Sequence, residues 1–533
     1  MTEPKDNIVR LVRDAETLSD GKLAAPSGSS APTEDKTKTG ADDIDLACAW
    51  LPRTDLGNAE RFLKRFGDSF LYVEQWGWLA WDGKRWNLQE ADAILARKVH
   101  LTIKAIADEA KAWRESEFDF IVDKKKGVDI WDSDKLKGWC LVSQSAAHIN
   151  CIGKLAQSHL TASPESFDVD PLAMNVDNGT LRFAKSDVGD YVTFHPHLRR
   201  DRMTKITPVA YDAAAQCPLY DKFLERVQPN ADMQRHLHAW GGVSLTALLI
   251  AKLSFWYGTG RNGKSTLADI WAHVMGDYAR TIPIESFLDQ GRTRRGGEAS
   301  PDIAALPGVR SLRTSEPEKR SKLAESLVKL VTGGEPVTAR HLNRDFFEFR
   351  PAFKLTMQGN YKPQIEGTDE GMWARIMLVP WQVMIPEAER DSELPAKLRA
   401  EAAGILNRLL DGLRDYLDYG LSPADEVIEA TAEYRDDSDP IGRFLKDCVE
   451  VHPPESGKKA PAHDLYHVYK AWAKSVGERR WSPKAFSRGL TDHGIMRLKS
   501  SQIFYLGIEI LKNESDFAGI GFGEEDTDDR NRR

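Results

Sequence analysis

The sequence predicts an α/β fold for the middle of the chain, preceded by an α+β region and followed by a small helical domain that ends in a hairpin. An apolar run, LSFWY, leads into the glycine-rich text GTGRNGKST and then into the helical text LADIWAHVM. From there to about Trp381, strand-like and helix-like segments alternate, which is typical of a parallel sheet covered by helices. Aromatic and β-branched runs broken by turn dipeptides predict hairpins on both sides of this core.

Composition limits the kinds of protein that this chain can be. Its 533 residues are 41% hydrophobic and 29% charged, as in soluble globular proteins of several domains. The sequence contains no apolar run of membrane-spanning length, and the start MTEPKDNIVR lacks a signal core, so we expect a cytoplasmic protein without membrane partners. Five scattered cysteines without a C-x-x-C pair argue against a disulfide framework or a zinc site. The net charge of −8 means that any nucleic-acid surface must be local.

Residues 1–44 are predicted to be a disordered tail, because they are rich in Ser, Pro, Gly and charge and have little to bury. Residues 45–212 are predicted to form an N-terminal α+β domain. It contains a hairpin in FLYVEQWGWLAWDGKRWNL, a helix from about 91 to 115, and further short strands. The turn dipeptides that support these strands are Asp82-Gly83, Asn178-Gly179 and Gly189-Asp190.

The loop after LSFWY fits a phosphate-binding pattern, G-x-x-x-x-G-K-[ST]. Glycine lets the backbone turn its N–H groups toward a triphosphate, and the following helix presents its positive end. Lys264 is placed to reach the β- and γ-phosphates, and Ser265 can offer its hydroxyl to Mg²⁺. The alternative is a chance glycine-rich turn. The predicted ligands of ATP are Gly258, Thr259, Gly260, Arg261, Asn262, Gly263, Lys264, Ser265 and Thr266.

Catalysis on a triphosphate also needs an acid, a polar group that senses the γ-phosphate, and often an arginine from a neighbour. Candidates occur in that order at or beside predicted strands: Glu316 with Glu318 as an alternative, then Asn360, then Arg375. Taken singly, the acids could belong to a solvated loop, Asn360 to a turn, and Arg375 to the surface.

The strand predicted before Glu316 is interrupted by Arg310 and Arg313. Buried arginines are costly unless they are paired. We therefore expect either that both side chains leave the sheet plane or that this strand is peripheral.

The chain from about residue 50 to 385 resembles the superfamily 3 helicases, specifically the phage/plasmid primase-helicase family related to the poxvirus primase-helicase. The strings that carry the resemblance are YGTGRNGKST, TSEPEK, KLVTGGEPVTAR, FFEFRPAFKLTMQGNYKPQI and GTDEGMWARI. WGWLAWDGKRW and NVDNGTL are similar to the family's helicase-associated domain. The resemblance implies an AAA+-like P-loop NTPase core over residues 213–385.

The resemblance also implies roles for single residues. Lys264 and Ser265 would hold phosphate and Mg²⁺, with Glu316 at the acidic position and Asn360 as the γ-phosphate sensor. Arg375 would act as an arginine finger on the neighbouring subunit's ATP, although Ala374 stands where the family often has another basic residue. A hairpin turning at Asn343-Arg344-Asp345 would contact DNA in the pore of a ring; its candidate DNA-binding residues are Arg340, His341 and Arg344.

The remainder of the chain is predicted to comprise a helical extension and linker over residues 386–436, a winged-helix-like domain over 437–511 and a disordered charged tail over 512–533. Ser482-Pro483 is a strong helix start, and the helix that follows carries Lys484 and Arg488 one turn apart. Residues 478–499 include six basic and two acidic residues, an excess that can contact DNA phosphates. The alternative is a protein-docking domain.

The leading hypothesis is an ATP-dependent DNA helicase of a phage, prophage or plasmid replication system, working in the host cytoplasm. It would act as a homo-oligomeric ring, expected to be hexameric, on single-stranded DNA and replication forks. We expect that the chain does not synthesise primers and that a separate primase is a partner. Two alternatives are an ATP-switched DNA-binding initiator or loader and a small-molecule phosphotransferase.

Overall fold

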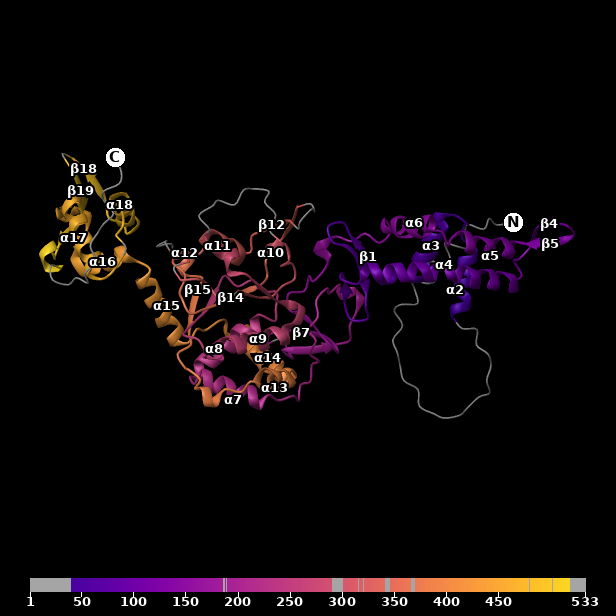
Figure 1. The fold of residues 1–533 in the computed structure, drawn as a ribbon, viewed down its shortest axis with the longest axis horizontal. Helices are drawn as coiled ribbons and strands as arrows, with labels where there is room; N and C mark the ends of the chain where they lie inside the picture. Colours follow the sequence, from indigo (N-terminus) through magenta and orange to yellow (C-terminus); the bar gives the residue numbers. More distant parts are fainter. Residues whose placement is uncertain are drawn as a thin grey trace. The chain divides into compact units, whose positions relative to one another are not determined.

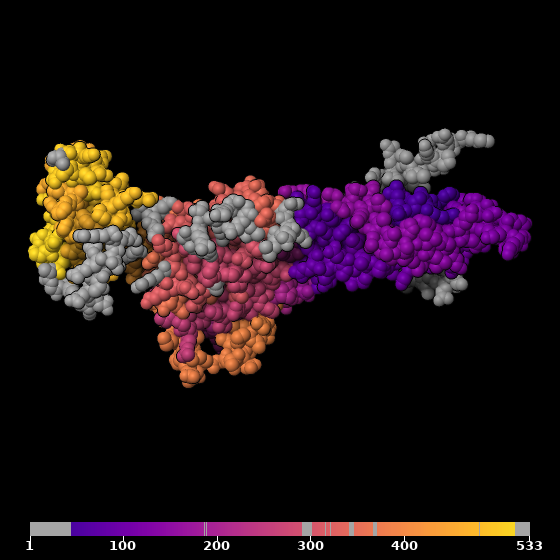
Figure 2. All heavy atoms as spheres, turned by 45° about the horizontal axis from the view of Figure 1, so that its top comes forward, coloured from indigo at the N-terminus to yellow at the C-terminus, as the bar shows by residue number. Residues whose placement is uncertain are grey.

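The computed structural model describes residues 40–517, except for 186, 188, 290–300, 315, 320, 341–345, 366–369, 479 and 501; the excluded segments are grey in Figure 2. The two predicted tails therefore lie largely outside the described residues. Among the helices that are described, none is both long enough and apolar enough to cross a membrane.

The chain divides into two compact units, one of which combines the residues up to Arg65 with Thr102–His148. At the centre of this unit, a salt bridge of 2.7 Å joins the fully buried side chains of Arg61 and Glu109. Burial raises the pKa of Glu109, and the charge of Arg61 opposes that rise. The predicted helix over 91–115 is confirmed as α4. The elements that contribute to this unit are α2 (Gly40–Ala49), α3 (Asp55–Phe66), α4 (Ala91–Glu115), β4 (Ile121–Lys125), β5 (Val128–Trp131), α5 (Asp132–Val142) and the start of α6 (Ala146–Gln157).

The second unit, Phe66–Leu101 with Ile149–Arg533, begins with two small antiparallel sheets. The predicted hairpin around Asp82-Gly83 is one half of a three-stranded meander, because a second turn precedes Gly77, whose φ is +95°. That turn, EQW, lacks the residues that usually mark turns. The predicted turn at Asn178-Gly179 is confirmed, with Val176 paired to Gly179. The strands are β1 (Phe70–Val73), β2 (Gly77–Trp81), β3 (Trp86–Asn87), β6 (Ala173–Val176), β7 (Gly179–Phe183) and β8 (Val192–His195).

A five-stranded parallel sheet forms the centre of the second unit, which confirms the predicted α/β core (Figure 1). Its strand order is β10-β11-β14-β9-β15, so the first strand in sequence lies between the last two. Ligands of such sheets bind beyond the carboxyl ends of the strands, where the strand order changes direction. The strands are β9 (Leu253–Tyr257), β10 (Ala279–Ile282), β11 (Ser311–Thr314), β14 (Lys354–Gly359) and β15 (Ile376–Pro380).

Helices cover both faces of this sheet, so its strands are buried on both sides (Figure 1). Trp256 and Val379 belong to one apolar core, whereas Phe255 and Leu378 belong to the other, as the alternation of side chains along a strand requires. The first core contains α7 (Pro218–Val227), α8 (Ala231–Val243), α9 (Lys264–Met275), α13 (Leu394–Ala400) and α14 (Ala402–Tyr419); the second contains α10 (Pro301–Ala304), α11 (Glu325–Gly333), α12 (Glu370–Trp373) and a tyrosine of α15 (Asp425–Asp437).

The structure explains how the core accommodates the two arginines near β11. The strand is interior, between β10 and β14, so the expectation of a peripheral strand is wrong. Arg310 lies just before the strand and is 2% exposed; it donates to the carbonyl oxygen of Leu245 and lies 4.4 Å from the ring centroid of Tyr278. Arg313 lies within the strand and reaches Asp269 with an ion pair of 2.5 Å.

Lys354, at the start of β14, is a second buried cation beside Arg310. Its side chain is 0% exposed, and its Nζ donates to the carbonyl oxygens of Thr246, Leu248 and Ala352 at 2.5, 3.2 and 3.0 Å. Burial, and then the charge of Arg310, holds the pKa of Lys354 well below its usual range. This lysine therefore anchors the segment that leads from α8 into β9.

The C-terminal part of the chain confirms the predicted order of helices and a final hairpin, and adds three short strands. The predicted turn at Lys499-Ser500-Ser501 joins two paired strands, with Lys499 opposite Ile503. This C-terminal part has a core of its own, which includes Phe444, Trp472 and Phe486. The elements are α16 (Pro440–Cys448), β16 (Val449–Val451), β17 (Lys459–Pro461), α17 (Ala462–Ser475), α18 (Pro483–Asp492), β18 (Arg497–Lys499), β19 (Ile503–Leu506) and β20 (Ile508–Ile510).

We predict that Lys354→Ala destabilises the core by about 3 kcal/mol, because it leaves three buried carbonyl oxygens without a donor and removes a buried stem. The measurement is the thermal unfolding transition followed by tryptophan fluorescence. Lys222→Ala, which removes an exposed lysine of α7, is the matched control and should leave the transition unchanged. Equal transitions for the two variants would contradict the anchoring role of Lys354.

Candidate nucleotide-binding site

The glycine-rich loop of residues 258–263 connects the carboxyl end of β9 to the first residue of α9, Lys264. Gly263 precedes the helix with a φ of +86°, in the left-handed region that glycine tolerates best. Arg261 also has a positive φ, +69°, which the sequence pattern does not predict. Because the first N–H groups of a helix have no partner within it, the loop and the start of α9 offer donors to an anion.

The end of β15 holds this loop in place. A Cβ atom added at Gly258 would lie 2.2 Å from the carbonyl oxygen of Trp381, so a side chain cannot fit there. The Nδ2 group of Asn262 donates to the carbonyl oxygens of Thr259 at 2.6 Å and Trp381 at 3.2 Å. Gly258 and Asn262 therefore keep the loop closed against the neighbouring strand.

Lys264 is the cation of the site, and its side chain is almost completely enclosed, at 3% exposed. Its Nζ donates to the carbonyl oxygen of Gly258 at 2.5 Å and to Oδ1 of Asn360 at 3.4 Å. Burial lowers the pKa of Lys264, and the negative charge of Glu316 opposes that effect. Among the described residues, no carboxylate is bonded directly to this ammonium group, so its charge remains available to an anionic ligand.

Asn360 connects Lys264 to Glu316. It follows β14, and its Nδ2 group donates to Oε2 of Glu316 at 3.0 Å. Glu316 follows β11, the strand beside β14, so the two side chains meet because their strands end at the same edge. The structure brings Glu316 into this line, whereas the exposed carboxylate of Glu318 has no bonded partner among the described residues.

The residues present fit ATP with Mg²⁺. The loop provides backbone donors, Lys264 provides a positive charge that is held only by neutral oxygens, and Ser265 is exposed at the start of α9. Glu316 supplies a carboxylate on the opposite side of Asn360. A hydroxyl and a carboxylate are ligands that Mg²⁺ accepts beside phosphate oxygens.

Arg375 lies at the amino ends of the strands, whereas this loop leaves the sheet at their carboxyl ends. It precedes β15, and its carbonyl oxygen accepts from the amide of Leu253, the first residue of β9. The five residues of β15 separate it from Trp381, a distance of about 20 Å along the strand. Its Nε donates to Oγ1 of Thr332 at 3.1 Å, and its Nη1 to the carbonyl oxygen of Gly371. Arg375 therefore does not contribute to the site of its own chain.

Of the predicted DNA-binding residues, the structure describes Arg340, Lys484 and Arg488. Arg340 ends β12 (Val337–Arg340), which pairs with β13 (Phe346–Phe349), and its guanidinium lies 4.7 Å from the ring centroid of Phe346. The other two hairpin candidates, His341 and Arg344, lie outside the described residues. Lys484 and Arg488 are both exposed on α18.

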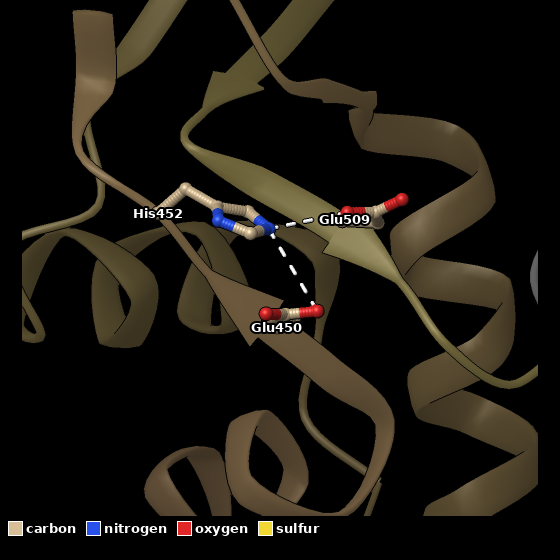
Figure 3. Close-up of side chains that lie close together, drawn as sticks. All are labelled: Glu450, His452 and Glu509. Carbon is tan, nitrogen blue, oxygen red and sulfur yellow. Dashed lines mark hydrogen bonds and ion pairs between the residues drawn. The ribbon is translucent and has the colours of Figure 1, made fainter. Parts of the chain in front are cut away.

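One other group of side chains deserves comparison with a metal site: Glu450, His452 and Glu509, whose ligand atoms lie within 4.8 Å of one another (Figure 3). His452 Nε2 lies 3.1 Å from Oε2 of Glu509 and 3.9 Å from Oε2 of Glu450. Lys458 Nζ already lies 2.7 Å from the same oxygen of Glu509. Lys458 therefore already supplies positive charge to Glu509, and we assign the group to ion pairing.

Two residues of functional interest have no recognisable signal in the sequence. Trp381 holds the loop through its carbonyl oxygen, and Thr332 binds Arg375 from the last turn of α11. Both contacts join segments far apart in the chain. A backbone carbonyl has no residue signature, and a threonine before two glycines is an ordinary helix end.

Known proteins match parts of this chain. A family model described as "D5 N terminal like" matches residues 59–229, and one described as "Poxvirus D5 protein-like" matches residues 436–496. "Putative helicase L207/L206" of Acanthamoeba polyphaga mimivirus is 28% identical over 272 residues, 48% of this chain and 28% of that protein. "Putative helicase 022R" of Frog virus 3 is 27% identical over 239 residues, 42% of this chain and 24% of that protein.

The match extends to a protein named "Putative primase" of African swine fever virus, which is 26% identical over 215 residues, 40% of this chain and 22% of that protein. The chain thus spans about a quarter of the length of these three relatives. The solved apo structure of the NrS-1 C terminal region aligns at a TM-score of 0.37 and 11% identity, over 63% of this chain and 96% of that one, too weakly to bear on function.

The two matched models flank the parallel sheet and its glycine-rich loop, and the viral relatives carry helicase or primase names. The matched models and the viral relatives together support placing this chain with the D5-like primase-helicases of superfamily 3.

Proposed function

We propose that this chain is an ATP-dependent DNA helicase that translocates on single-stranded DNA as a homo-oligomeric ring, hexameric by analogy with the family. The observation that supports it most directly is the line of Lys264, Asn360 and Glu316 at the carboxyl edge of the sheet. A buried cation, an amide and a carboxylate in hydrogen-bonded sequence are the groups that hydrolysis of a nucleoside triphosphate requires.

In this proposal each side chain has a distinct task. The amides of residues 258–266 and the ammonium group of Lys264 bind the phosphates and orient the terminal one. Ser265 and Glu316 would hold Mg²⁺, whose charge would polarise the terminal phosphoryl group that ATP supplies. The Asn360 amide, held between Lys264 and Glu316, orients the attacked group and the water. Enclosure of Lys264 strengthens these electrostatic interactions because little water competes for them.

We propose that Arg375 completes the site of a neighbouring subunit. The length of β15 separates it from its own loop, so it can contribute to catalysis only across an interface. Its ordered side chain, held by Thr332 and the Gly371 carbonyl, is suited to presenting a fixed positive charge there. Because Arg375 can act only on a neighbour's site, the proposal requires an assembly of subunits.

We propose that residues 440–510 form a winged-helix domain that contacts DNA. Its order is helix, strand, strand, helix, helix, strand, strand, strand, with α18 in the position of a recognition helix. Lys484 and Arg488 on α18 and the exposed Arg497 and Lys499 on β18 provide positive charge for phosphates. Such a domain also favours the second candidate, an ATP-switched initiator or loader. Primer synthesis would belong to a separate partner.

The test of the proposal is the steady-state ATPase rate with and without single-stranded DNA. We expect the native chain to be stimulated by DNA and Lys264→Ala to be inactive, because it removes the charge that binds the phosphates. Lys222→Ala serves as the control and should match the native chain. ATP binding without DNA-stimulated hydrolysis would favour the initiator, whereas hydrolysis indifferent to DNA would favour a phosphotransferase.

Glu316→Gln and Glu318→Gln form a matched pair that tests which acid acts. We predict that Glu316→Gln lowers kcat by about 100-fold or more while ATP binding persists, because only Glu316 is bonded to Asn360. Glu318→Gln should stay within about twofold of the native rate, since its carboxylate contacts none of these groups. The reverse pattern would overturn the assignment.

Mixing inactive variants tests whether Arg375 acts across the interface. Arg375→Ala alone should hydrolyse about 1,000-fold more slowly than the native chain. Mixed with Lys264→Ala, it should regain activity, because about a quarter of the interfaces in a random equimolar ring pair an intact Lys264 with a neighbour's intact Arg375. The Lys264→Ala/Arg375→Ala double variant is the control partner and should restore nothing. Mixed rings that stay inactive would show that Arg375 is not a shared residue.

A further inference from the structure

Two histidines of the C-terminal part lie on one face of α17, in a region that the proposed function does not use. His463 and His467 are four residues apart on this helix, and their ring centroids are 4.2 Å apart with an angle of 36° between the ring planes. Side chains at positions i and i+4 of a helix lie one above the other. This is the spacing at which a single helix presents two imidazoles to one cation.

A carboxylate is paired with the Nδ1 atom of each ring. Asp464 Oδ1 lies 3.2 Å from Nδ1 of His463, and Glu514 Oε1 lies 2.7 Å from Nδ1 of His467. Because an ionised carboxylate only accepts, each Nδ1 carries a proton, and the Nε2 atom of a neutral ring keeps its lone pair. Histidines that bind metals are oriented in the same way, by a carboxylate on the nitrogen that does not touch the ion.

The charge of these four side chains is matched by a divalent cation. Among the residues that the structure describes, neither Asp464 nor Glu514 is paired with a lysine or an arginine. The group of side chains in Figure 3 differs, because Lys458 already pairs with its Glu509. Two protonated rings would also balance the carboxylates, but two imidazolium groups with centroids 4.2 Å apart repel one another. One metal ion shared by both rings supplies the same charge without that repulsion.

Glu514 reaches the histidine pair from outside the helix. It begins the short 3-10 helix Glu514–Phe517, which follows the last strand, and the ring of Phe517 packs against the C-terminal core. A cation on Nε2 of His467 withdraws electrons from the ring, and a more positive ring donates a stronger hydrogen bond from Nδ1. Metal binding therefore strengthens the contact that fastens this segment to α17.

We propose that His463 and His467 bind one divalent transition-metal ion of the Zn²⁺ class through their Nε2 atoms. Asp464 and Glu514 are the positioning residues, and water fills the remaining coordination positions, since the side chain of His463 is 76% exposed. Imidazole nitrogen suits Zn²⁺, Ni²⁺ and Cu²⁺, whereas Mg²⁺ prefers oxygen ligands. The site therefore takes a different ion from the one proposed at the glycine-rich loop, and it does not depend on the helicase function.

The test is an isothermal calorimetric titration of the untagged full chain with Zn²⁺, in millimolar Mg²⁺ that occupies sites made of oxygen ligands. We expect one Zn²⁺ per chain in the tightest site. His463→Gln and His467→Gln should each weaken that binding about 10-fold or more, because each removes a ligand. Glu514→Gln should weaken it about 10-fold, the effect of losing a carboxylate that orients a metal-binding histidine.

His452→Gln is the matched control, because this histidine also pairs with a carboxylate but has Lys458 beside it. It should keep the native Zn²⁺ affinity. Without metal, His463→Gln should unfold at the native temperature, since it replaces an exposed side chain, so a loss of binding cannot be assigned to misfolding. Zn²⁺ should raise the unfolding temperature of the native chain and leave that of His463→Gln unchanged.

The outcomes of the titration either support or overturn the metal site. Native Zn²⁺ affinity in His463→Gln overturns it, and so does a loss of binding in His452→Gln alone. A native chain that binds no Zn²⁺ overturns it as well. The helicase proposal stands or falls separately, on the DNA-stimulated ATPase rate.

Discussion

The parallel pairing of β14 with β9 on one side and β11 on the other is the interaction on which the site depends. Gly359 lies opposite Tyr257, so β14 and β9 end at the same level. Lys264, Asn360 and Glu316 follow from this register, because each belongs to a segment that leaves the sheet at that edge. A one-residue slip of β14 would turn its buried side chains to the wrong face and move Asn360 away from Lys264.

At the amino ends of the strands, the buried polar groups are basic side chains. Lys354 and Arg310 are buried there, and both are bonded to backbone carbonyl oxygens, some of them in the segment between α8 and β9. These cations hold a polar backbone segment that has no regular secondary structure, which would otherwise leave buried carbonyls without donors. Arg375 belongs to this edge as well. The sheet therefore separates Arg375, which we propose acts on a neighbour, from the loop that we propose binds nucleotide.

The carboxyl and amino edges of the sheet therefore carry different functional groups. The carboxyl edge presents donors and one buried cation for a bound anion, and the amino edge presents Arg375. In the proposed assembly, the amino edge of one subunit meets the carboxyl edge of the next, which is the geometry of a head-to-tail ring. Helix α11 holds Arg375 through Thr332 and is followed directly by the β12–β13 hairpin.

The sequence by itself determined the features that depend on neighbouring residues. The glycine-rich loop, the helix over 91–115 and the turn at Asn178-Gly179 follow from backbone preferences and periodicity within short windows. The bounds of the helix and the turn agree with the structure, whereas α9 begins at Lys264, three residues before the predicted helical text. Only the tertiary structure decided which acid approaches Asn360, since Glu316 and Glu318 are equivalent locally and differ only once β11 and β14 are paired. It also decided how Arg310 is buried, through Tyr278 and the Leu245 carbonyl, and which group holds Arg375. These contacts join segments tens of residues apart, and no local preference encodes the strand order that brings them together.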